Sequence, residues 1–267
     1  MSRLYSITML IFTTDKARLL HHFQKDPVLF SYHIGDLDDS YFNDCQWAVD
    51  YHERARIEEA VLIYTGCQIP AVLAFGLSDR FPALLEQIVD ILPPRFYCHF
   101  HPYERKIFKR YFIEHSLGTF IKMKYENVSK TFAGADNKIK KLDMSYRDKL
   151  IELYQKSYPE NYFTEKMLLT GKYYGYLEKG KILSAAGVHV YSDDYKIAVL
   201  GNIVTDLNHR GKGLSSLVTS RLVTELANEN KQICLNVKKD NLPAIQVYKK
   251  LGFIEKHEYE ESLFELK

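Results

Sequence analysis

The chain has 267 residues, and at roughly 150 residues per domain this length predicts two compact domains. With 46% apolar and 26% charged residues, the composition excludes collagen-like, low-complexity and wholly disordered proteins. The 36 Lys and Arg residues against 34 Asp and Glu leave a formal net charge of +2, which argues against nucleic acid as the partner.

The first half of the chain is expected to be a small unit of mixed helices and strands. The apolar periodicity and turn residues predict a helix over 16–23, strands over 60–64 and 70–75 around a turn at 65–68, and a helix over 81–92. From 126 to 137 this periodicity is lost and small polar residues dominate, as in a linker. We therefore expect a boundary near Ala135, with domains over 1–135 and 136–267.

The second half shows a clearer order of elements. The pattern predicts strands over 139–142, 173–177, 182–191, 197–205 and 232–237, with helices over 146–158 and 164–170 and from Gly211 onward. The helix after Gly211 carries one apolar stripe, made of Leu214, Leu217, Val218, Leu222 and Leu226. A last helix has Asn241 as its cap, Pro243 in its first turn and Gly252 as its end, with Ala244, Val247, Tyr248 and Leu251 facing inward.

The four cysteines lie far apart, without the spacing of a disulfide framework, so a reducing, cytoplasmic location is expected. Cys98, His99 and His101 match no standard zinc spacing, and strand alternation places Cys98 on the opposite face from the histidines. We therefore expect no metal. The apolar run over 7–12 is too short for a signal peptide or a membrane span, which predicts no membrane association.

A glycine-rich loop opens the helix that follows the strand over 197–205. Its residues are Arg210, Gly211, Lys212, Gly213, Leu214 and Ser215. Backbone N–H groups at a helix N-terminus lack intrahelical partners and face the positive end of the helix dipole, so an anion such as a pyrophosphate fits there. The loop is neither a Walker P-loop nor a G-x-G-x-x-G fingerprint, and alone it is also consistent with a simple packing turn.

Together with the segment from Asn241 to Phe253, this loop resembles the GNAT superfamily of acyl-CoA-dependent acyltransferases. The R/Q-x-x-G-x-G/A pattern is met by Arg210 and Gly213, with Ser215 where Gly or Ala is usual; Ser215 is small enough for a phosphate to approach closely. The N-x-x-A-x-x-x-Y-x-x-x-G-F pattern is met at Asn241, Ala244, Tyr248, Gly252 and Phe253.

The resemblance covers residues 136–267 and implies an α/β (α+β) fold with a mixed, mostly antiparallel central sheet flanked by helices. The segments 58–76 and 173–187 faintly parallel each other, since both read as strand, glycine turn and strand. The chain therefore looks like a tandem GNAT protein whose first copy has lost cofactor binding. We expect that copy to wall the acceptor pocket or to hold the two domains together.

The resemblance also implies the site residues. The backbone of Ile203, Val204 and Thr205 would bind the pantetheine arm of acetyl-CoA, and the loop from Arg210 to Ser215 would hold its pyrophosphate. Asn241 would contact the pantetheine or the adjacent backbone. The thioester would lie where the strands bearing Ile203 and Asn236 splay apart, with a backbone N–H near Val204 or Thr205 stabilising the oxyanion.

Tyr248 is the candidate general acid, because in direct transfer the departing thiolate must be protonated by a hydroxyl near the sulfur. The alternative is that Tyr248 only packs beside its neighbours. The strand over 197–205 contains no Asp or Glu, so the general base is less clear. Histidine is the side chain type whose charge changes near neutral pH, so His189 could serve as the base, but it also fits a structural role; a water relay or capture of the neutral amine stays equally open.

We interpret the chain as an N-acyltransferase that moves an acetyl or other short acyl group from coenzyme A to a small-molecule or peptide amine, as a monomer or homodimer. A non-catalytic acyl-CoA-binding or sensor protein of the same fold is the alternative, since the base is missing. Aminoacyl transfer from tRNA is a third hypothesis, which the near-neutral charge and the intact loop both disfavour.

Overall fold

The computed structural model describes residues 11–52, 56–126, 136–229 and 231–267. The chain divides into two compact units. The first unit contains residues 1–120 and 257–267, and the second contains residues 121–256. The boundary expected near Ala135 lies outside the described residues. The division found in the structure differs from the expected one, because the C-terminal residues return to the first unit and residues from before the linker join the second.

The first unit has a sheet in the order β1-β2-β3-β4-β5-β12-β6. Its elements are β1 (Ile11–Phe12), α1 (Lys16–Phe23), α2 (Ser31–Gly35), α3 (Asp39–Phe42), β2 (Cys45–His52), β3 (Arg56–Tyr64), β4 (Ala71–Ala74), α4 (Phe81–Ile88), β5 (Arg95–Phe100), the 3-10 helix η1 (Pro102–Ile107) and β6 (Tyr111–Tyr125). Strand β4 pairs antiparallel with β3 and parallel with β5. Its core includes Phe96, Phe100, Phe108 and Phe264, with the α4 residues Leu84, Leu85 and Ile88.

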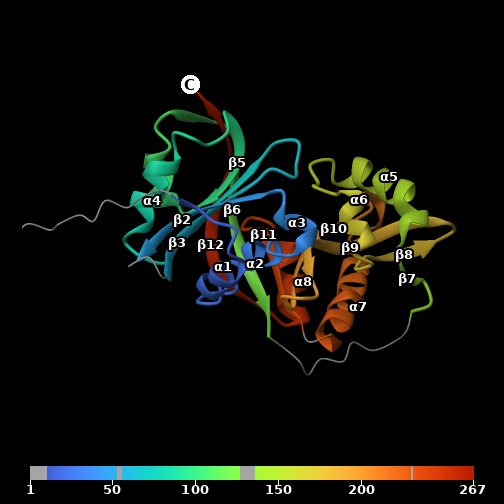
Figure 1. The fold of residues 1–267 in the computed structure, drawn as a ribbon. Coiled ribbons are helices and arrows are strands. Elements are labelled where there is room, and N and C mark those ends of the chain that lie inside the picture. The colour runs from blue at the N-terminus through green and yellow to red at the C-terminus, as the bar shows by residue number, and fades with distance from the viewer. Residues whose placement is uncertain (1–10, 53–55, 127–135, 230) are drawn as a thin grey trace, which may run out of the picture. The chain divides into compact units, whose positions relative to one another are not determined.

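The second unit has its strands in the order β12-β6-β11-β10-β9-β8-β7. Its elements are β7 (Ile139–Lys141), the 3-10 helix η2 (Met144–Tyr146), α5 (Arg147–Ser157), α6 (Glu165–Leu169), β8 (Tyr174–Glu178), β9 (Lys181–Ser192), β10 (Ile197–Thr205), the 3-10 helix η3 (Leu207–His209), α7 (Leu214–Asn228), β11 (Gln232–Lys238), α8 (Leu242–Leu251) and β12 (Phe253–Leu266). Helices α5 and α6 lie on one side of β8 and β9, and α7 lies on the other (Figure 1).

The two halves of the chain repeat one succession of elements. In each half, three successive strands pair antiparallel: β2, β3 and β4 in the first half, and β8, β9 and β10 in the second. A helix follows the third strand, α4 or α7, and the strand after that helix, β5 or β11, pairs parallel with the third strand. The hairpin β3–β4 therefore corresponds to β9–β10, and the parallel drawn from the sequence between 58–76 and 173–187 is displaced by one hairpin.

The last strand of each half lies beside a strand of the other half. Strand β12 pairs antiparallel with β5, from Glu260 opposite Phe100 to Glu265 opposite Arg95. Strand β6, which ends the first half, is the neighbour of β11 in the sheet, and its residues from Ile121 onward belong to the second unit. Each unit therefore needs residues from both halves of the chain to complete its sheet.

The sheet is mixed and mostly antiparallel, as the resemblance implied, and the expected helices are present with small shifts of their ends. One side-chain assignment is wrong. Leu217 is 39% exposed, so the buried stripe of α7 is Leu214, Val218, Leu222 and Leu226 without it. In α8, Tyr248 and Leu251 are buried as expected, Ala244 and Val247 are partly buried against the same core, and Ile245 is buried as well.

No helix in the described ranges is long and apolar enough to cross a membrane. The four cysteines, Cys45, Cys67, Cys98 and Cys234, are free thiols.

Candidate active site

The strands β10 and β11 separate at one end of their parallel ladder. The ladder runs from Ile197 opposite Gln232 to Leu200 opposite Leu235. Both strands continue past this point, to Thr205 and to Lys238, without further pairing to each other among the described residues. The ladder therefore ends before Ile203 and Asn236, where the resemblance implied that the two strands splay apart.

A bulge in β10 lies beside this splay. Gly201 pairs with Gly187 and Val204 with Ala185, so β10 has one residue more than β9 between these pairs. Asn202 has a positive φ of 53°, which non-glycine residues rarely adopt. Its carbonyl oxygen accepts a hydrogen bond from the Tyr154 hydroxyl at 2.8 Å, and its Nδ2 donates to the Tyr173 hydroxyl at 3.1 Å. These buried contacts hold the unusual backbone and turn it out of the regular ladder.

The loop between β10 and α7 is held by Asp206. Its carboxylate accepts hydrogen bonds from Lys156 at 2.7 Å and from the Asn208 backbone N–H at 3.0 Å, and it lies 2.8 Å from the His209 ring. The Lys156 ammonium and His209 hold the pKa of Asp206 well below its ordinary value. The only carboxylate of this loop is therefore occupied and a poor base.

The glycine-rich loop presents its backbone to solvent. Gly211 and Gly213 have φ values of 77° and 75°, and a Cβ at either position would meet no atom within 4 Å. Because α7 begins at Leu214, the N–H groups of its first turn have no carbonyl ahead of them within the helix. Arg210 and Lys212 are exposed beside these N–H groups. An open backbone cradle flanked by two cations fits a pyrophosphate group.

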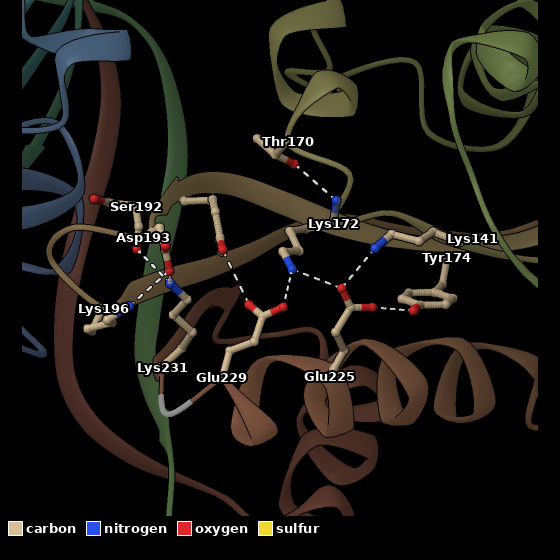
Figure 2. Close-up of polar contacts among 11 residues, drawn as sticks. Lys141, Thr170, Lys172, Tyr174, Ser192, Asp193, Lys196, Glu225, Glu229 and Lys231 are labelled. Atoms are coloured by element: carbon tan, nitrogen blue, oxygen red, sulfur yellow. Dashed lines mark hydrogen bonds and ion pairs between the residues drawn. The ribbon is translucent and has the colours of Figure 1, made fainter.

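The opposite end of α7 is anchored by charge. Figure 2 shows that the carboxylate of Glu225 accepts hydrogen bonds from Lys172 at 2.8 Å, from Lys141 at 2.9 Å and from the Tyr174 hydroxyl. Lys172 also pairs with Glu229, one helical turn later. Burial alone would raise the pKa of Glu225, but the hydrogen bonds from Lys172, Tyr174 and Lys141 lower it to about 2. This network fixes the position of the helix that carries the loop.

A second network adjoins it at the end of α7. The Lys231 side chain, which is fully buried, pairs with Asp193, and so does Lys196. Lys231 also lies 4.6 Å from the centre of the Tyr191 ring, whose hydroxyl donates to Glu229 at 3.2 Å. Tyr191 lies on β9, Asp193 and Lys196 lie between β9 and β10, and Lys231 lies between α7 and β11, so these contacts tie the end of α7 to the sheet.

Helix α8 is capped by Asn241 and carries Tyr248. The side-chain oxygen of Asn241 accepts a hydrogen bond from the Ala244 N–H at 3.3 Å, so in this structure Asn241 holds the adjacent backbone. Tyr248 is 7% exposed, and its ring contacts Phe253 with centroids 6.0 Å apart. Burial, with the nearby Tyr158 adding to it, raises the pKa of Tyr248, so its phenol keeps its proton at neutral pH. Gly252 ends the helix with a φ of 100°.

His189 lies at the splay. It is the additional residue of a bulge in β9, between Val188 opposite Leu200 and Val190 opposite Val199. A Cβ on Gly201 would come within 2.2 Å of the His189 ring, so the imidazole lies directly over this glycine. Gly201 is the first residue of β10 after the ladder with β11 ends. The structure therefore brings His189 next to the splay.

The described residues contain no group of three or more His, Cys, Asp or Glu side chains that could hold a metal ion. Cys98 is fully buried, whereas His99 lies 3.4 Å from Glu261 on β12 and stacks on Tyr259. His101 stacks on Tyr103 and caps the 3-10 helix η1.

The corresponding loop of the first unit, between β4 and α4, is closed by a carboxylate. Glu59 on β3 is fully buried, and it accepts hydrogen bonds from the N–H groups of Leu77 at 3.1 Å and Ser78 at 2.6 Å. Burial raises the pKa of Glu59. In the second unit the loop at this place keeps its backbone open. In the first unit, these two backbone N–H groups already have a partner in the Glu59 carboxylate.

Sequence reasoning missed two site residues, Asn202 and Tyr154. Asn202 lies within the bulge and has a positive φ, yet the search for a carboxylate on this strand gave it no role. The available signal was Gly201-Asn202 within an apolar strand, since Gly and Asn are the residues that tolerate bulge conformations. Tyr154 gave no separate signal, because its spacing on α5 is that of an ordinary core residue.

Comparisons with known proteins show which sequences and folds the chain resembles. Residues 173–262 match the family described as FR47-like protein. One curated relative, an uncharacterized N-acetyltransferase named YobR from Bacillus subtilis, is 41% identical over 81 residues. The match covers 29% of this chain and about a third, 32%, of the relative.

Several solved structures share the fold over nearly the whole chain. A protein from Drosophila matches with a TM-score of 0.74 at 11% identity, over 97% of this chain and 99% of its own. A GNAT-family acetyltransferase from Colwellia psychrerythraea matches with a TM-score of 0.57 at 13% identity, over 97% and 100%. A tandem GNAT protein from the clavulanic acid biosynthesis pathway matches with a TM-score of 0.56 at 12% identity, over 96% and 98%.

Proposed function

Because residues 173–262 form an FR47-like segment and the chain has the fold of GNAT acetyltransferases, we propose that this protein transfers an acetyl or other short acyl group from coenzyme A to an amine. The observation that carries the proposal is the combination, within one unit, of a β10–β11 splay and an open glycine loop at the start of α7. The acceptor class we propose is a small-molecule or peptide amine.

The second unit would hold acetyl-CoA through backbone groups. The pyrophosphate would lie on the loop from Arg210 to Ser215, and the pantetheine arm would run along Ile203 to Thr205, on the edge of β10 that no longer pairs with β11. The bulge at Asn202 turns nearby backbone N–H groups away from the ladder. A preorganised N–H donor at the thioester oxygen stabilises the charge that develops there, typically by about 3 kcal/mol.

Tyr248 is the proposed general acid. Its phenol is protonated at neutral pH and sits on the helix that follows β11, so it has a proton to give to the departing thiolate. His189, over Gly201 at the splay, is the proposed group that accepts the proton from the amine. Direct transfer then forms the amide bond and breaks the C–S bond, and coenzyme A leaves as the thiol.

The test of this assignment is Tyr248→Phe, which removes the hydroxyl and keeps the ring that packs on Phe253. Turnover should fall about 10²-fold while the Kd for acetyl-CoA, measured by calorimetry, stays within about twofold. Phe253→Leu is the control for packing in the same contact. An unchanged turnover number in Tyr248→Phe would remove the tyrosine from the mechanism.

A second candidate function is acyl-CoA binding without turnover. It is favoured by the absence of any Asp or Glu on β10 and β11 and by the engagement of Asp206 with Lys156 and His209. Following free thiol with acetyl-CoA and a panel of amines separates the two. Thiol release that depends on an amine supports the transferase, and tight binding of coenzyme A without release on any amine supports the sensor.

We also propose that the first unit is a GNAT-like copy that does not bind the cofactor. The Glu59 carboxylate, buried against the Leu77 and Ser78 N–H groups, supports this, because a pyrophosphate would have to displace it. Calorimetry should then give one acetyl-CoA per chain. Two equivalent sites per chain would contradict the proposal.

A further inference from the structure

Asn236 has an amide group without a protein partner at the splay. Both its Oδ1 and its Nδ2 are buried, and neither has a hydrogen-bond partner among the described residues. Buried side-chain amides in native proteins are nearly always hydrogen-bonded, because an unsatisfied polar group costs about 1–3 kcal/mol. An amide with both ends open is available to a ligand that supplies the missing partners.

The location of this amide follows from the strand register. Leu200 and Leu235 are the last pair of the parallel ladder, so Gly201 and Asn236 are the next residues on their strands. In a parallel sheet, the two residues that come directly after a pair of opposite residues have their side chains on the same face of the sheet. The His189 ring lies over Gly201 at the position of its missing Cβ, which places His189 and Asn236 on that one face, at the mouth of the splay.

The chemistry of an amide identifies what it can bind. The Oδ1 of Asn236 accepts a hydrogen bond and cannot take a proton, whereas Nδ2 only donates. In the proposed function, backbone N–H groups of β10 donate hydrogen bonds to the thioester oxygen. The amine nucleophile is then the reacting group that still needs a hydrogen-bond acceptor. The other unpartnered amide oxygen here, that of Asn202, belongs to a side chain already tied through Nδ2 to Tyr173 and Met167.

We propose that Asn236 binds the acceptor amine: its Oδ1 accepts one amine N–H and so aims the nitrogen lone pair at the thioester carbon, with His189 beside it. The inference rests on the proposed function and adds a residue that sets acceptor binding. The Nδ2 donor of Asn236 favours an amine substrate that carries a hydrogen-bond acceptor close to its amine, such as the carbonyl of an α-amino amide. Alaninamide should therefore bind better than a simple alkylamine of equal size.

The kinetic test uses the whole chain, with alaninamide, lysinamide, tyramine and propylamine as probes and thiol release as the readout. Asn236→Ala should raise the amine KM about tenfold for alaninamide, the effect of losing one or two hydrogen bonds, and should leave the Kd for coenzyme A unchanged. Asn236→Asp keeps an acceptor oxygen and should retain the wild-type amine KM or lower it. Cys234→Ala is the control, because Cys234 is buried on the same face of β11 but lies inside the ladder opposite Val199.

A binding readout keeps this test separate from that of the transferase activity. The side-chain amide signal of Asn236, assigned by its loss in Asn236→Ala, should shift in the NMR spectrum when alaninamide is added to the protein saturated with coenzyme A. Thiol release with an unmoved signal, or with an unchanged KM in Asn236→Ala, overturns the role of Asn236 and leaves the transferase. A shifted signal without release on any amine supports the contact and contradicts the transferase. Neither a shift nor release contradicts both.

Discussion

Glu225→Gln is expected to destabilise the second unit, and by an amount that depends on pH. The pKa of Glu225 is about 2 in the folded protein, against 4.5 for an ordinary glutamate. At about 1.4 kcal/mol per pH unit, this difference contributes about 3 kcal/mol to the free energy of unfolding. The side chain is only 17% exposed, so solvent screens little of this interaction.

The sign of the pH dependence follows from the depressed pKa. A carboxyl with a lower pKa in the folded state stabilises the protein fully above the unfolded value, 4.5, and this stabilisation is lost as the pH falls toward 2. At pH 7, Glu225→Gln should therefore lose about 3 kcal/mol, whereas near pH 2 the variant and the wild type should unfold alike. Lys172 and Lys141 lose their main partner in the variant at neutral pH.

Urea unfolding at several pH values, followed by far-UV circular dichroism, measures this difference. The single tryptophan, Trp47, is buried in the first unit, so its fluorescence reports that unit separately. Glu178→Gln is the control, since its ion pair with Lys138 is exposed and should contribute nothing measurable. A loss below about 0.5 kcal/mol, or a loss equal at pH 7 and pH 3, would refute the reasoning.

Three further substitutions test other parts of the structure. Gly201→Ala places a Cβ 2.2 Å from the His189 ring and would displace the imidazole. Thiol release should therefore fall at least tenfold, while calorimetry should show that coenzyme A still binds. A rate near that of the wild type would show that the imidazole has no fixed role there. Gly213→Ala adds a side chain at a backbone position with φ of 75°, which costs about 1–2 kcal/mol. The substitution should weaken acetyl-CoA binding in the same calorimetric assay. Equal affinity would contradict the role of the loop in holding the pyrophosphate. Burial raises the pKa of Glu104 to about 8, so the contribution of Glu104 to the stability of the first unit is complete below pH 4.5 and falls as the pH rises toward 8. Glu104→Gln should remove this loss and stabilise the unit by about 3 kcal/mol at pH 7, as Trp47 fluorescence would show. A parallel pH dependence in both proteins would argue against it.

The sequence alone predicted most of the local structure of the second unit. The strand over 197–205, the loop from Arg210 to Ser215 and the helix from Asn241 to Gly252 are where the pattern placed them. These elements are specified locally, by glycines that adopt positive φ, by a capping asparagine and by apolar periodicity. Local signals of this kind act between residues a few positions apart, so they can be read from one chain.

Only the tertiary structure decided which residues complete each unit and which side chains meet. Nothing local in residues 253–267 indicates that β12 pairs with β5, more than 150 residues earlier, because strand pairing depends on distant partners. The same holds for His189 over Gly201, for the open amide of Asn236 at the end of a ladder, and for the carboxylate of Glu59 on the Ser78 N–H. The sequence determined the glycine-rich loop and the ends of the helices that follow it; the register between distant strands decided which residues stand around the splay.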